Sequence, residues 1–317
     1  MFKNVYDMIQ KANSVAIFVH INPDGDAFGS ARAMQLYLQS IGKTADIFSN
    51  DDVDEYFSFL NIENKLDKEP IQNYDLSLVL DCSDIKRIGR CAIQFYKSKN
   101  SICIDHHTDY TRFTQISINV PTASSTGILV YQFMKEFNIP FTDDICIALY
   151  TAIASDTGAF IHSNTSYVEH YAIAEMMKNS PNVDYGDLNF RLFKSKTLSS
   201  VLVLKTALEN MKFYCDNNLL LTYITKENLK NCNAGEDDTS SISGFINGIQ
   251  NIKCAIVLMQ KEDNEYRVSI RSSGEYARLV AGKFGGGGHP QAAGCRVYGT
   301  LEDSIDQIVE VAKGILC

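Results

Sequence analysis

The chain has 317 residues, of which 45% are hydrophobic, and a formal net charge of −9. A chain of this length and composition can fill a hydrophobic core, and it predicts two globular domains. The acidic net charge excludes a surface that coats long nucleic acid, because such binding needs many lysine and arginine contacts to phosphates. The longest apolar runs are far too short to span a bilayer and no secretory pattern precedes them, so we expect a cytoplasmic protein that contacts neither long duplex nucleic acid nor a membrane.

Nine cysteines are scattered singly along the chain, with no Cys-x-x-Cys pair. An odd number without paired spacing indicates neither a disulfide framework nor a cysteine zinc site. We therefore expect the cysteines to be buried as small apolar residues.

The first half alternates short β-rich runs with longer helical patterns, which is typical of an α/β fold with a parallel sheet covered by helices. The expected elements are strands at 15–19, 45–48, 76–80 and 102–104 and a helix at 27–42. Two further helices are expected at 124–138 and 143–155, the first of which ends before Pro140 because proline disfavours a helical residue in front of it.

A cluster of Asn, Ser, Pro, Asp and Gly at 179–186 indicates a domain boundary, and a connecting helix is expected at 188–208. The rest predicts a smaller mixed α/β domain with strands at 219–224, 255–260 and 266–271, helices at 241–249 and 301–315, and a glycine run at 285–288. We accordingly divide the chain into an N-terminal domain at 1–183, a helical linker at 184–210 and a C-terminal domain at 211–317.

His20, Asp24 and Asp26 directly follow the first predicted strand. In open α/β sheets ligands bind beyond the carboxyl ends of strands, and Gly25 between the two carboxylates permits a tight turn. The two aspartates could then bind two different ions. A turn whose aspartates only cap the next helix explains the same residues equally well, so this motif alone leaves both interpretations open.

Two further polar motifs follow predicted strands. Asp81 comes directly after the run at 76–80, where a lone aspartate is usually a cap, and Asp105, His106 and His107 follow the run at 102–104. Adjacent histidines after a carboxylate are harder to explain by packing, because neighbouring side chains of an extended strand diverge and one can bind a metal while the other faces a substrate. A solvated loop pair is the alternative.

Asp156 ends the helical pattern that begins at residue 143 and is followed by Thr157 and Gly158, which alone is an ordinary helix ending. Carboxylates and histidines nevertheless recur at four element ends within one domain, and such a set suits hard or borderline cations such as Mn²⁺ or Mg²⁺. His162 and His170 lie outside these motifs and are expected to be surface or structural residues.

These motifs resemble those of the DHH phosphoesterase family in order and approximate spacing, at 20–30, at Asp81, at 105–107 and at Asp156. Cys82 stands where a small hydroxyl residue is more usual in that family. The C-terminal region is similar to the DHH-associated domain through two stretches, 268–272 and 285–294. Together the resemblances cover almost the whole chain, and its length is most similar to that of the compact nanoRNases that also act as pAp phosphatases.

The resemblance implies a two-metal site, with Mn²⁺ as the expected ion and Mg²⁺ as the alternative. One cation would bind His20, Asp24 and Asp81; the other would bind Asp26, Asp81, His106 and Asp156, so that Asp81 bridges them. A water activated between the cations would attack phosphorus in line. His107 would contact the scissile phosphate and assist the leaving oxygen, with Asp105 as a further catalytic residue.

In the C-terminal region the glycine run and two basic side chains suit a phosphate pocket. Successive glycine N–H groups can bind a phosphate, and Arg271 and His289 add charge-assisted donors, whereas a flexible linker is the default interpretation of such a run. The predicted phosphate-binding residues are Arg271, Ser272, Gly286, Gly287, Gly288 and His289.

The resemblance implies that substrates of about two to five nucleotides, or pAp, bind between the two domains and are hydrolysed to mononucleotides or AMP. Three alternatives stay open: cleavage of cyclic or linear dinucleotides such as c-di-AMP or pApA, hydrolysis of pyrophosphate or polyphosphate, and a noncatalytic nucleotide-binding or RNA-interaction module. The glycine motif disfavours a pyrophosphatase, and the complete set of expected ligands disfavours a binding module. The sequence does not determine the oligomeric state, for which a homodimer is one prediction.

Overall fold

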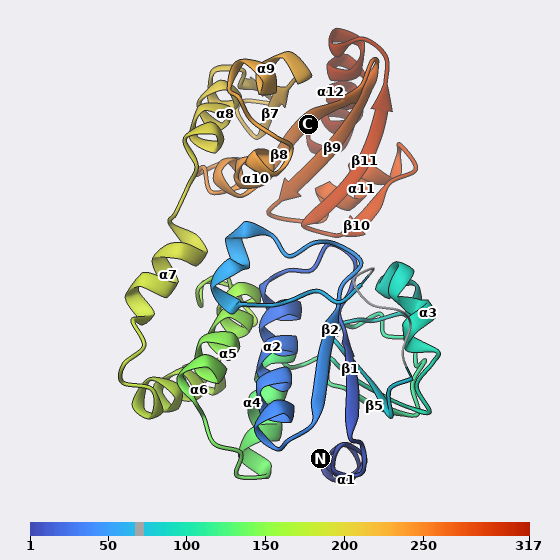
Figure 1. The fold of residues 1–317 in the computed structure, drawn as a ribbon. Helices are drawn as coiled ribbons and strands as arrows, with labels where there is room; N and C mark the ends of the chain where they lie inside the picture. Colours follow the sequence, from blue (N-terminus) through green and yellow to red (C-terminus); the bar gives the residue numbers. More distant parts are fainter. Residues whose placement is uncertain (67–72) are drawn as a thin grey trace. The chain divides into compact units, whose positions relative to one another are not determined.

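The computed structural model describes residues 1–66 and 73–317, and the chain divides into two compact units, Met1–Ser195 and Lys196–Cys317 (Figure 1). Within the described ranges no helix has both the length and the hydrophobicity of a transmembrane span.

The first unit is built on a parallel sheet in the strand order β2-β1-β3-β4-β5. Its strands are β1 (Ser14–Phe18), β2 (Thr44–Phe48), β3 (Leu76–Leu80), β4 (Asn100–Asp105) and β5 (Ile116–Asn119). The predicted α/β class is therefore confirmed. The sequence pattern indicated β1 to β4 but not the edge strand β5, which is short and only half-buried.

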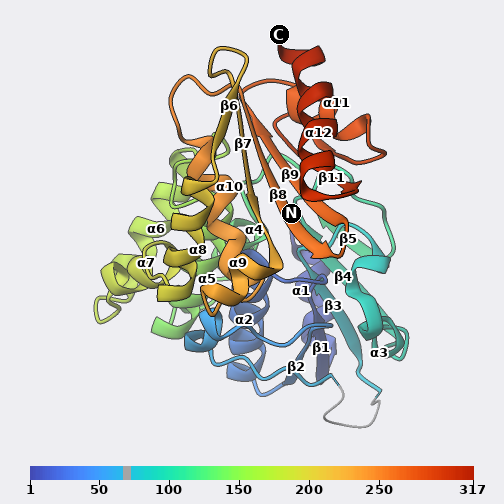
Figure 2. The same ribbon diagram turned by 90° about the horizontal axis from the view of Figure 1, so that it is seen from above.

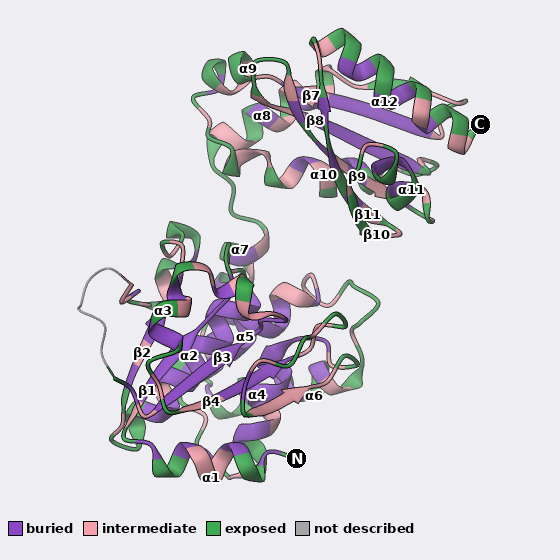
Figure 3. Cartoon of the chain, turned by 90° about the vertical axis from the view of Figure 1, so that its right-hand side faces the viewer, coloured by how far each residue is buried: buried purple, intermediate pink, exposed green. Residues whose placement is uncertain are grey.

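Helices cover both faces of this sheet, which explains why its central strands are apolar without alternation. Leu78 of β3 belongs to the core beneath α2, α4 and α5, while its neighbour Val79 belongs to a second core on the side of α3. Figure 3 shows these strands as buried. The helices are α1 (Lys3–Lys11), α2 (Gly25–Ser40), α3 (Ala92–Phe95), α4 (Thr126–Glu136), α5 (Asp143–Asp156), α6 (Tyr167–Asn179) and α7 (Tyr185–Phe193), with 3-10 turns at Glu55–Leu60 and Ile85–Cys91.

The expected connecting helix at 188–208 is wrong: the structure has two helices there, α7 and α8 (Leu198–Glu209). Thr197 interrupts the helical pattern because its side chain accepts a hydrogen bond from the N–H of Ser200 and so caps α8. Leu188 of α7 packs in the core of the first unit, whereas Val203 of α8 packs in the second. The predicted linker at 184–210 is thus divided between the two units.

The second unit contains a mixed sheet in the order β10-β11-β9-β8-β7-β6, in which only β7 and β8 are parallel (Figure 2). Helices α11 and α12 pack on one face, and α8 and α10 cover part of the other. The strands are β6 (Lys212–Tyr214), β7 (Leu219–Ile224), β8 (Cys254–Glu262), β9 (Glu265–Ser272), β10 (Gly287–His289) and β11 (Ala292–Tyr298). The remaining helices are α9 (Lys226–Asn231), α10 (Ser240–Asn247), α11 (Tyr276–Gly282) and α12 (Leu301–Leu316), with a 3-10 turn at Asp237–Thr239.

A disulfide joins Cys215, in the turn before β7, to Cys317 after α12, with the two Cα atoms 5.9 Å apart. The expectation that no cysteine is paired is therefore wrong for these two. Their separation of 102 residues carries no spacing signal in the sequence, because only the fold brings them together. The other seven cysteines are free and buried, as expected.

Candidate metal centre

The carboxyl ends of three adjacent parallel strands, β1, β3 and β4, lie at one edge of the first sheet and bring the predicted polar residues together. Three overlapping groups of ligand atoms, each within 4.8 Å of one another, occur among the described residues: His20 with Asp24 and Asp81; Asp26 with His106 and Asp156; Asp81 with His106 and His107. The first group contains the three residues of the first predicted ligand set, and the second contains three of the four residues of the second set, with Asp81 close to His106.

The position of Asp24 is compatible with both interpretations of its motif, the helix cap and the metal ligand. One carboxylate oxygen accepts hydrogen bonds from the N–H groups of Asp26 and Ala27, at 3.0 and 3.1 Å, and so caps α2. The same side chain lies within the group formed with His20 and Asp81. Gly25 is required here for space rather than for a turn, because a β-carbon on it would lie 1.9 Å from the hydroxyl oxygen of Ser155 on α5.

Asp81 lies at the centre of the cluster. Its Oδ2 atom is 3.4 Å from Nε2 of His20, and its Oδ1 atom is 3.5 Å from Nε2 of His106. The residue is 2% exposed, and its φ angle of 57° places it in the left-handed region, which aspartate and asparagine adopt more readily than other residues with a side chain. A buried carboxylate between two imidazoles has the position expected of a bridging ligand.

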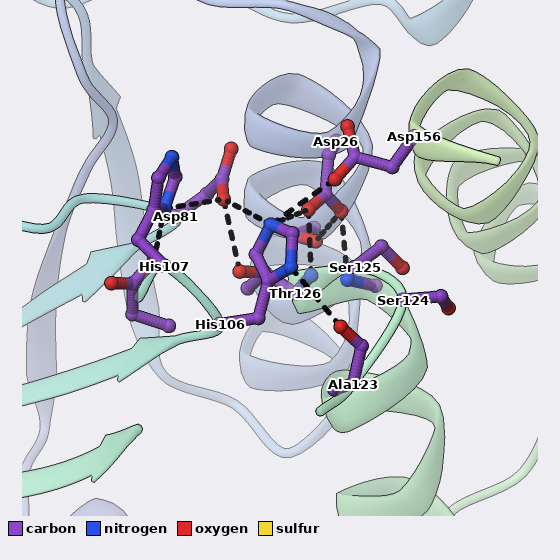
Figure 4. A network of polar contacts seen from close by, with 12 residues as sticks. Asp26, Asp81, His106, His107, Ala123, Ser124, Ser125, Thr126 and Asp156 are labelled. Carbon is purple, nitrogen blue, oxygen red and sulfur yellow. Dashed lines mark hydrogen bonds and ion pairs between the residues drawn. The ribbon is translucent and has the colours of Figure 1, made fainter. Parts of the chain in front are cut away.

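The two histidines His20 and His106 are oriented in the same way. Nδ1 of His20 lies 2.7 Å from the carbonyl oxygen of Ile21, and Nδ1 of His106 lies 3.3 Å from that of Ala123. Donation of the Nδ1 proton to a carbonyl leaves Nε2 unprotonated and able to bind a metal. Figure 4 shows His106 directed toward Asp26, Asp81 and Asp156, and its Nε2 atom is 3.1 Å from Oδ2 of Asp156.

His107 is held differently from its neighbour. Its Nδ1 atom lies 2.8 Å from Oδ1 of Asp105, a carboxylate that is fully buried and whose Oδ2 atom has no partner among the described residues. This bond raises the pKa of His107, since it outweighs the opposing effect of burial. The sequence expectation that adjacent histidines diverge agrees with these different partners.

The electrostatics of the cluster favour cations. Burial raises the pKa of Asp26 well above its ordinary value, and the charges of Asp81 and Asp156 raise it further. Burial lowers the pKa of His106, but hydrogen bonds to Asp156 and Asp81 outweigh it and raise this pKa to about 11. Crowded carboxylates thus attract positive charge, and a divalent cation supplies more of it than a histidine proton does. The donor set of carboxylate oxygens and imidazole nitrogens fits such cations.

The start of α4 contributes contacts that sequence reasoning missed. The N–H groups of Thr126 and Gly127 donate to the two oxygens of Asp26 at 2.6 and 2.7 Å, and the hydroxyl of Thr126 donates to Oδ1 of Asp81 at 3.1 Å (Figure 4). A carboxylate at a helix N-terminus is stabilised by unpaired N–H groups and by the helix dipole. The signal in the sequence is Ser-Thr-Gly at 125–127, a capping pattern that leaves backbone N–H groups at the helix start able to bind an anion.

His162 and His170 are exposed, and neither belongs to the cluster. Nδ1 of His162 lies 3.1 Å from the backbone carbonyl oxygen of Asp156, to which Asn164 also donates at 3.2 Å. These contacts fix the backbone at the end of α5, where the side chain of Asp156 enters the cluster.

In the second unit Arg271 and His289 lie on one face of the sheet. Arg271 on β9 is paired with Ala292 on β11, and Ala292 is paired with His289 on β10, so these three positions share a face. Gly287 lies on the same face, where a β-carbon would contact nothing within 4 Å.

The predicted phosphate-binding role is wrong for Ser272 and Gly286. Ser272 is buried on the opposite face, where its hydroxyl accepts from the N–H of Ala277 at 3.0 Å and donates to the carbonyl of Gly274 at 2.9 Å. The N–H of Gly286 donates to the carbonyl of Ala281 at 2.9 Å. Gly288, with a φ angle of 140°, permits close packing, because a β-carbon would lie 2.5 Å from the carbonyl oxygen of Ala292. The glycine run therefore forms a helix end and an edge strand.

The sequence matches the DHH family, N-terminal domain, over residues 14–153 and the DHHA1 domain over residues 217–316. Two relatives are named bifunctional oligoribonuclease and PAP phosphatase NrnA. That of Thermus thermophilus is 26% identical over 305 residues, which cover 94% of this chain and 89% of the relative. That of Bacillus subtilis is 26% identical over 301 residues, which cover 94% of this chain and 93% of the relative.

A crystal structure of an exopolyphosphatase-related protein from Bacteroides fragilis is 25% identical in sequence. It superimposes with a TM-score of 0.89 over 99% of this chain and 95% of that one. These similarities agree with the order of the histidine and aspartate motifs in the first unit. The chain contains a DHH family N-terminal domain followed by a DHHA1 domain.

Proposed function

We propose that this protein is a metal-dependent phosphoesterase that hydrolyses very short oligoribonucleotides to mononucleotides and pAp to AMP. One observation carries the proposal: Asp81 lies between His20 and His106, in a cluster where the ligand groups overlap at these residues, one pair of groups sharing Asp81 and another sharing His106. The printed names of the NrnA relatives support the substrate class. The cytoplasmic location and a homodimer remain predictions from the sequence.

The groups of ligand atoms support one set of residues for each cation. His20, Asp24 and Asp81 would hold the first cation; Asp26, His106 and Asp156, together with the neighbouring Asp81, would hold the second. The mixture of carboxylates with one imidazole for each ion favours Mn²⁺, with Mg²⁺ as the alternative. When bound, two such cations supply Lewis acidity, charge neutralisation and a water of lowered pKa for attack on phosphorus.

The protein's own groups orient the substrate and the proton. Asp105 holds Nδ1 of His107, so that Nε2 is the atom available to a phosphate oxygen. Its raised pKa keeps His107 protonated to higher pH than a free histidine, and a protonated Nε2 can donate to the scissile phosphate or to the leaving oxygen. The second unit contributes Arg271, His289 and Gly287 as phosphate-binding residues, since they share an accessible sheet face.

A substrate screen with Mn²⁺ tests the proposal. The substrates are pAp, pApA, c-di-AMP, pyrophosphate and single strands of increasing length, and the products are separated by chromatography. We expect hydrolysis of pAp and of the shortest linear strands, no hydrolysis by Asp81→Ala, and a higher KM for Arg271→Ala. Equal or faster degradation of long strands, opening of the cyclic ring alone, or release of phosphate from pyrophosphate alone would each contradict the substrate class. Hydrolysis of none of them would favour a binding module.

A further inference from the structure

The segment 123–127, which leads into α4, contacts three of the four residues expected to bind the second cation. Among residues 1–66 and 73–317, no hydrogen bond joins this segment to His20 or Asp24 of the first set. The position of the segment therefore affects one cation site more than the other. Its contacts are those of Ala123 with His106, of Thr126 and Gly127 with Asp26, and of Thr126 with Asp81 (Figure 4).

Asn164 joins this segment to Asp156, the fourth residue of the set. Its side-chain nitrogen donates to the carbonyl oxygen of Ser124 at 3.0 Å and to that of Asp156 at 3.2 Å. A side-chain amide has two N–H donors, so both hydrogen bonds can form at once. Asn164 therefore links the backbone before α4 to the end of α5 and restricts the distance between the ligands on either side.

The turn between Asp156 and Asn164 has an unfavourable backbone. Three successive residues, Gly158, Ala159 and Phe160, have φ angles of 56°, 56° and 67°. A bulky residue such as phenylalanine rarely adopts the left-handed region, and strain of this kind is often found at functional sites, where the surrounding structure maintains it. This turn reverses the chain after α5, so that Asn164 reaches back to the carbonyl of Asp156.

Glu169 of α6 holds the same segment through a second contact. The residue is 3% exposed, and its Oε1 atom accepts a hydrogen bond from the hydroxyl of Ser124 at 2.9 Å. Its Oε2 atom accepts from the N–H and the hydroxyl of Ser166, at 2.6 and 2.7 Å. Burial raises the pKa of Glu169, but the hydrogen bonds from Ser166 and Ser124 outweigh it and lower this pKa. A charged acceptor forms stronger hydrogen bonds than a neutral one, so Glu169 fixes Ser124 firmly.

We propose that Asn164 and Glu169 are positioning residues of the second cation site, which they hold in place through the segment 123–127. Glu169 lies outside the ligand groups and Asn164 acts through its N–H donors, so neither residue is itself a ligand. This inference rests on the proposed function, because it concerns the metal centre of that reaction. The two cations should therefore respond differently when the segment is released, since His20 and Asp24 keep their own contacts.

The first test is a calorimetric titration of the full-length protein with Mn²⁺. Asn164 is exposed, so Asn164→Ala should fold, and it should weaken one of the two binding events roughly tenfold or more while the other stays unchanged. Asn210→Ala is the matched control, because the amide of Asn210 also donates to a backbone carbonyl, that of Tyr223 in the second unit, at 3.1 Å. Two unchanged binding events in Asn164→Ala, or equal weakening of both, would overturn the selective positioning role.

The second test separates the link to α6 from the stability of that helix. Ser124→Ala removes the link but keeps the bonds between Glu169 and Ser166 that cap α6. Glu169→Gln keeps a side-chain oxygen for Ser166 and an amide donor for the hydroxyl of Ser124. The affinity for the weakened Mn²⁺ should therefore fall roughly tenfold in Ser124→Ala and by less in Glu169→Gln. An unchanged affinity in Ser124→Ala, or a larger loss in Glu169→Gln, would overturn the role of Glu169.

The third test needs no metal and uses hydrogen exchange with mass spectrometry in EDTA. The N–H groups of Thr126 and Gly127 exchange when their bonds to Asp26 open. Exchange in peptides that contain 124–127 should be faster in Asn164→Ala and unchanged in Asn210→Ala. Equal exchange in both variants and the unmodified protein would overturn the positioning role. An unmodified protein that binds no Mn²⁺ but shows this difference would contradict the proposed function alone.

Discussion

At the scale of single residues, the candidate site depends on contacts that fix side chains before any ligand arrives. Two backbone carbonyls orient His20 and His106, a buried carboxylate orients His107, and the start of α4 holds Asp26. Each contact limits the positions that a metal-binding atom can take. The free-energy cost of ordering these side chains is therefore met when the chain folds, not when a ligand binds. Single substitutions should therefore separate ligands from the groups that position them.

Asp81→Asn tests the bridging position. Asparagine keeps the shape and tolerates the left-handed backbone, but it removes the charge shared by both cations. Outer contacts of a metal site typically contribute 10- to 100-fold, so loss of this direct ligand should reduce kcat/KM by more than about 100-fold and weaken Mn²⁺ binding. Calorimetric titration with Mn²⁺ and hydrolysis of pAp measure the two effects.

Asp84→Asn is the control for this substitution, since Asp84 only caps the 3-10 turn that follows β3. Wild-type Mn²⁺ affinity in Asp81→Asn would contradict a bridging role.

Thr126→Val tests a positioning contact, because valine has the same shape as threonine but cannot donate to Oδ1 of Asp81. The N–H groups at the start of α4 would still bind Asp26. We expect Mn²⁺ affinity to fall by roughly 10- to 100-fold. In Thr151→Val the lost hydroxyl contacts only a carbonyl within α5, so its affinity should stay unchanged. Equal effects of the two substitutions would indicate a general loss of packing instead.

At the scale of elements, close packing of α2 against α5 brings Asp26 and Asp156 into one cluster. Gly29 of α2 permits this approach, because a β-carbon there would lie 2.4 Å from the carbonyl oxygen of Ala148. Gly25 and Gly127 meet side chains of α5 in the same way. Glycine in a helix interior is unfavourable by itself, so its presence at these contacts reflects the space they require.

Gly29→Ala should destabilise the first unit by about 1–3 kcal/mol, since overpacking outweighs the gain in helix propensity. Gly314→Ala is the matched control in α12, where a β-carbon would contact nothing within 4 Å, and it should stabilise the protein by about 0.5–1 kcal/mol. Urea unfolding followed by circular dichroism measures both. A stabilised Gly29→Ala variant would show that α2 and α5 can move apart at little cost.

At the scale of the whole molecule, the sequence predicted the α/β class and the residues at strand ends because both follow from local patterns. Buried parallel strands appear in the sequence as apolar runs, and their carboxyl ends meet at one edge of the sheet. The sequence therefore predicts that Asp81 and His106 lie close together. The bond from Thr126 to Asp26 joins residues 100 positions apart, and the Cys215–Cys317 pair is similarly distant. Such contacts depend on how elements pack, which periodicity does not encode.

The sequence did not predict the short strands β5, β6 and β10, because three or four residues are too few to show an alternation of apolar and polar side chains. The break between α7 and α8 escaped it because both segments have a helical pattern, and only their burial in different cores separates them. The phosphate-binding role predicted for Ser272 is wrong because it groups Ser272 with its neighbour Arg271. Neighbouring side chains of a strand point to opposite faces of the sheet.

The division into two units predicts a local response to metal. Cations that bind only the first unit stabilise it by about 2.7 kcal/mol at 100 times the Kd. In hydrogen exchange with mass spectrometry, Mn²⁺ should therefore slow exchange in peptides that contain 20–30, 105–107 and 124–127. Peptides from β8, β9 and β11 should be unaffected. EDTA should reverse the effect, and Asp81→Asn should abolish it; equal protection of both units would contradict a site confined to the first.

The left-handed backbone at Asp81 also limits how this position can change during evolution. Glycine, asparagine and aspartate adopt that conformation at little cost, whereas glutamate, the other carboxylate, would be both strained and too long. Aspartate is therefore the only residue that meets the demands of backbone and charge together. A single-nucleotide change to asparagine would preserve the fold while removing the charge, so a lineage could lose its chemistry in one step and keep an intact scaffold.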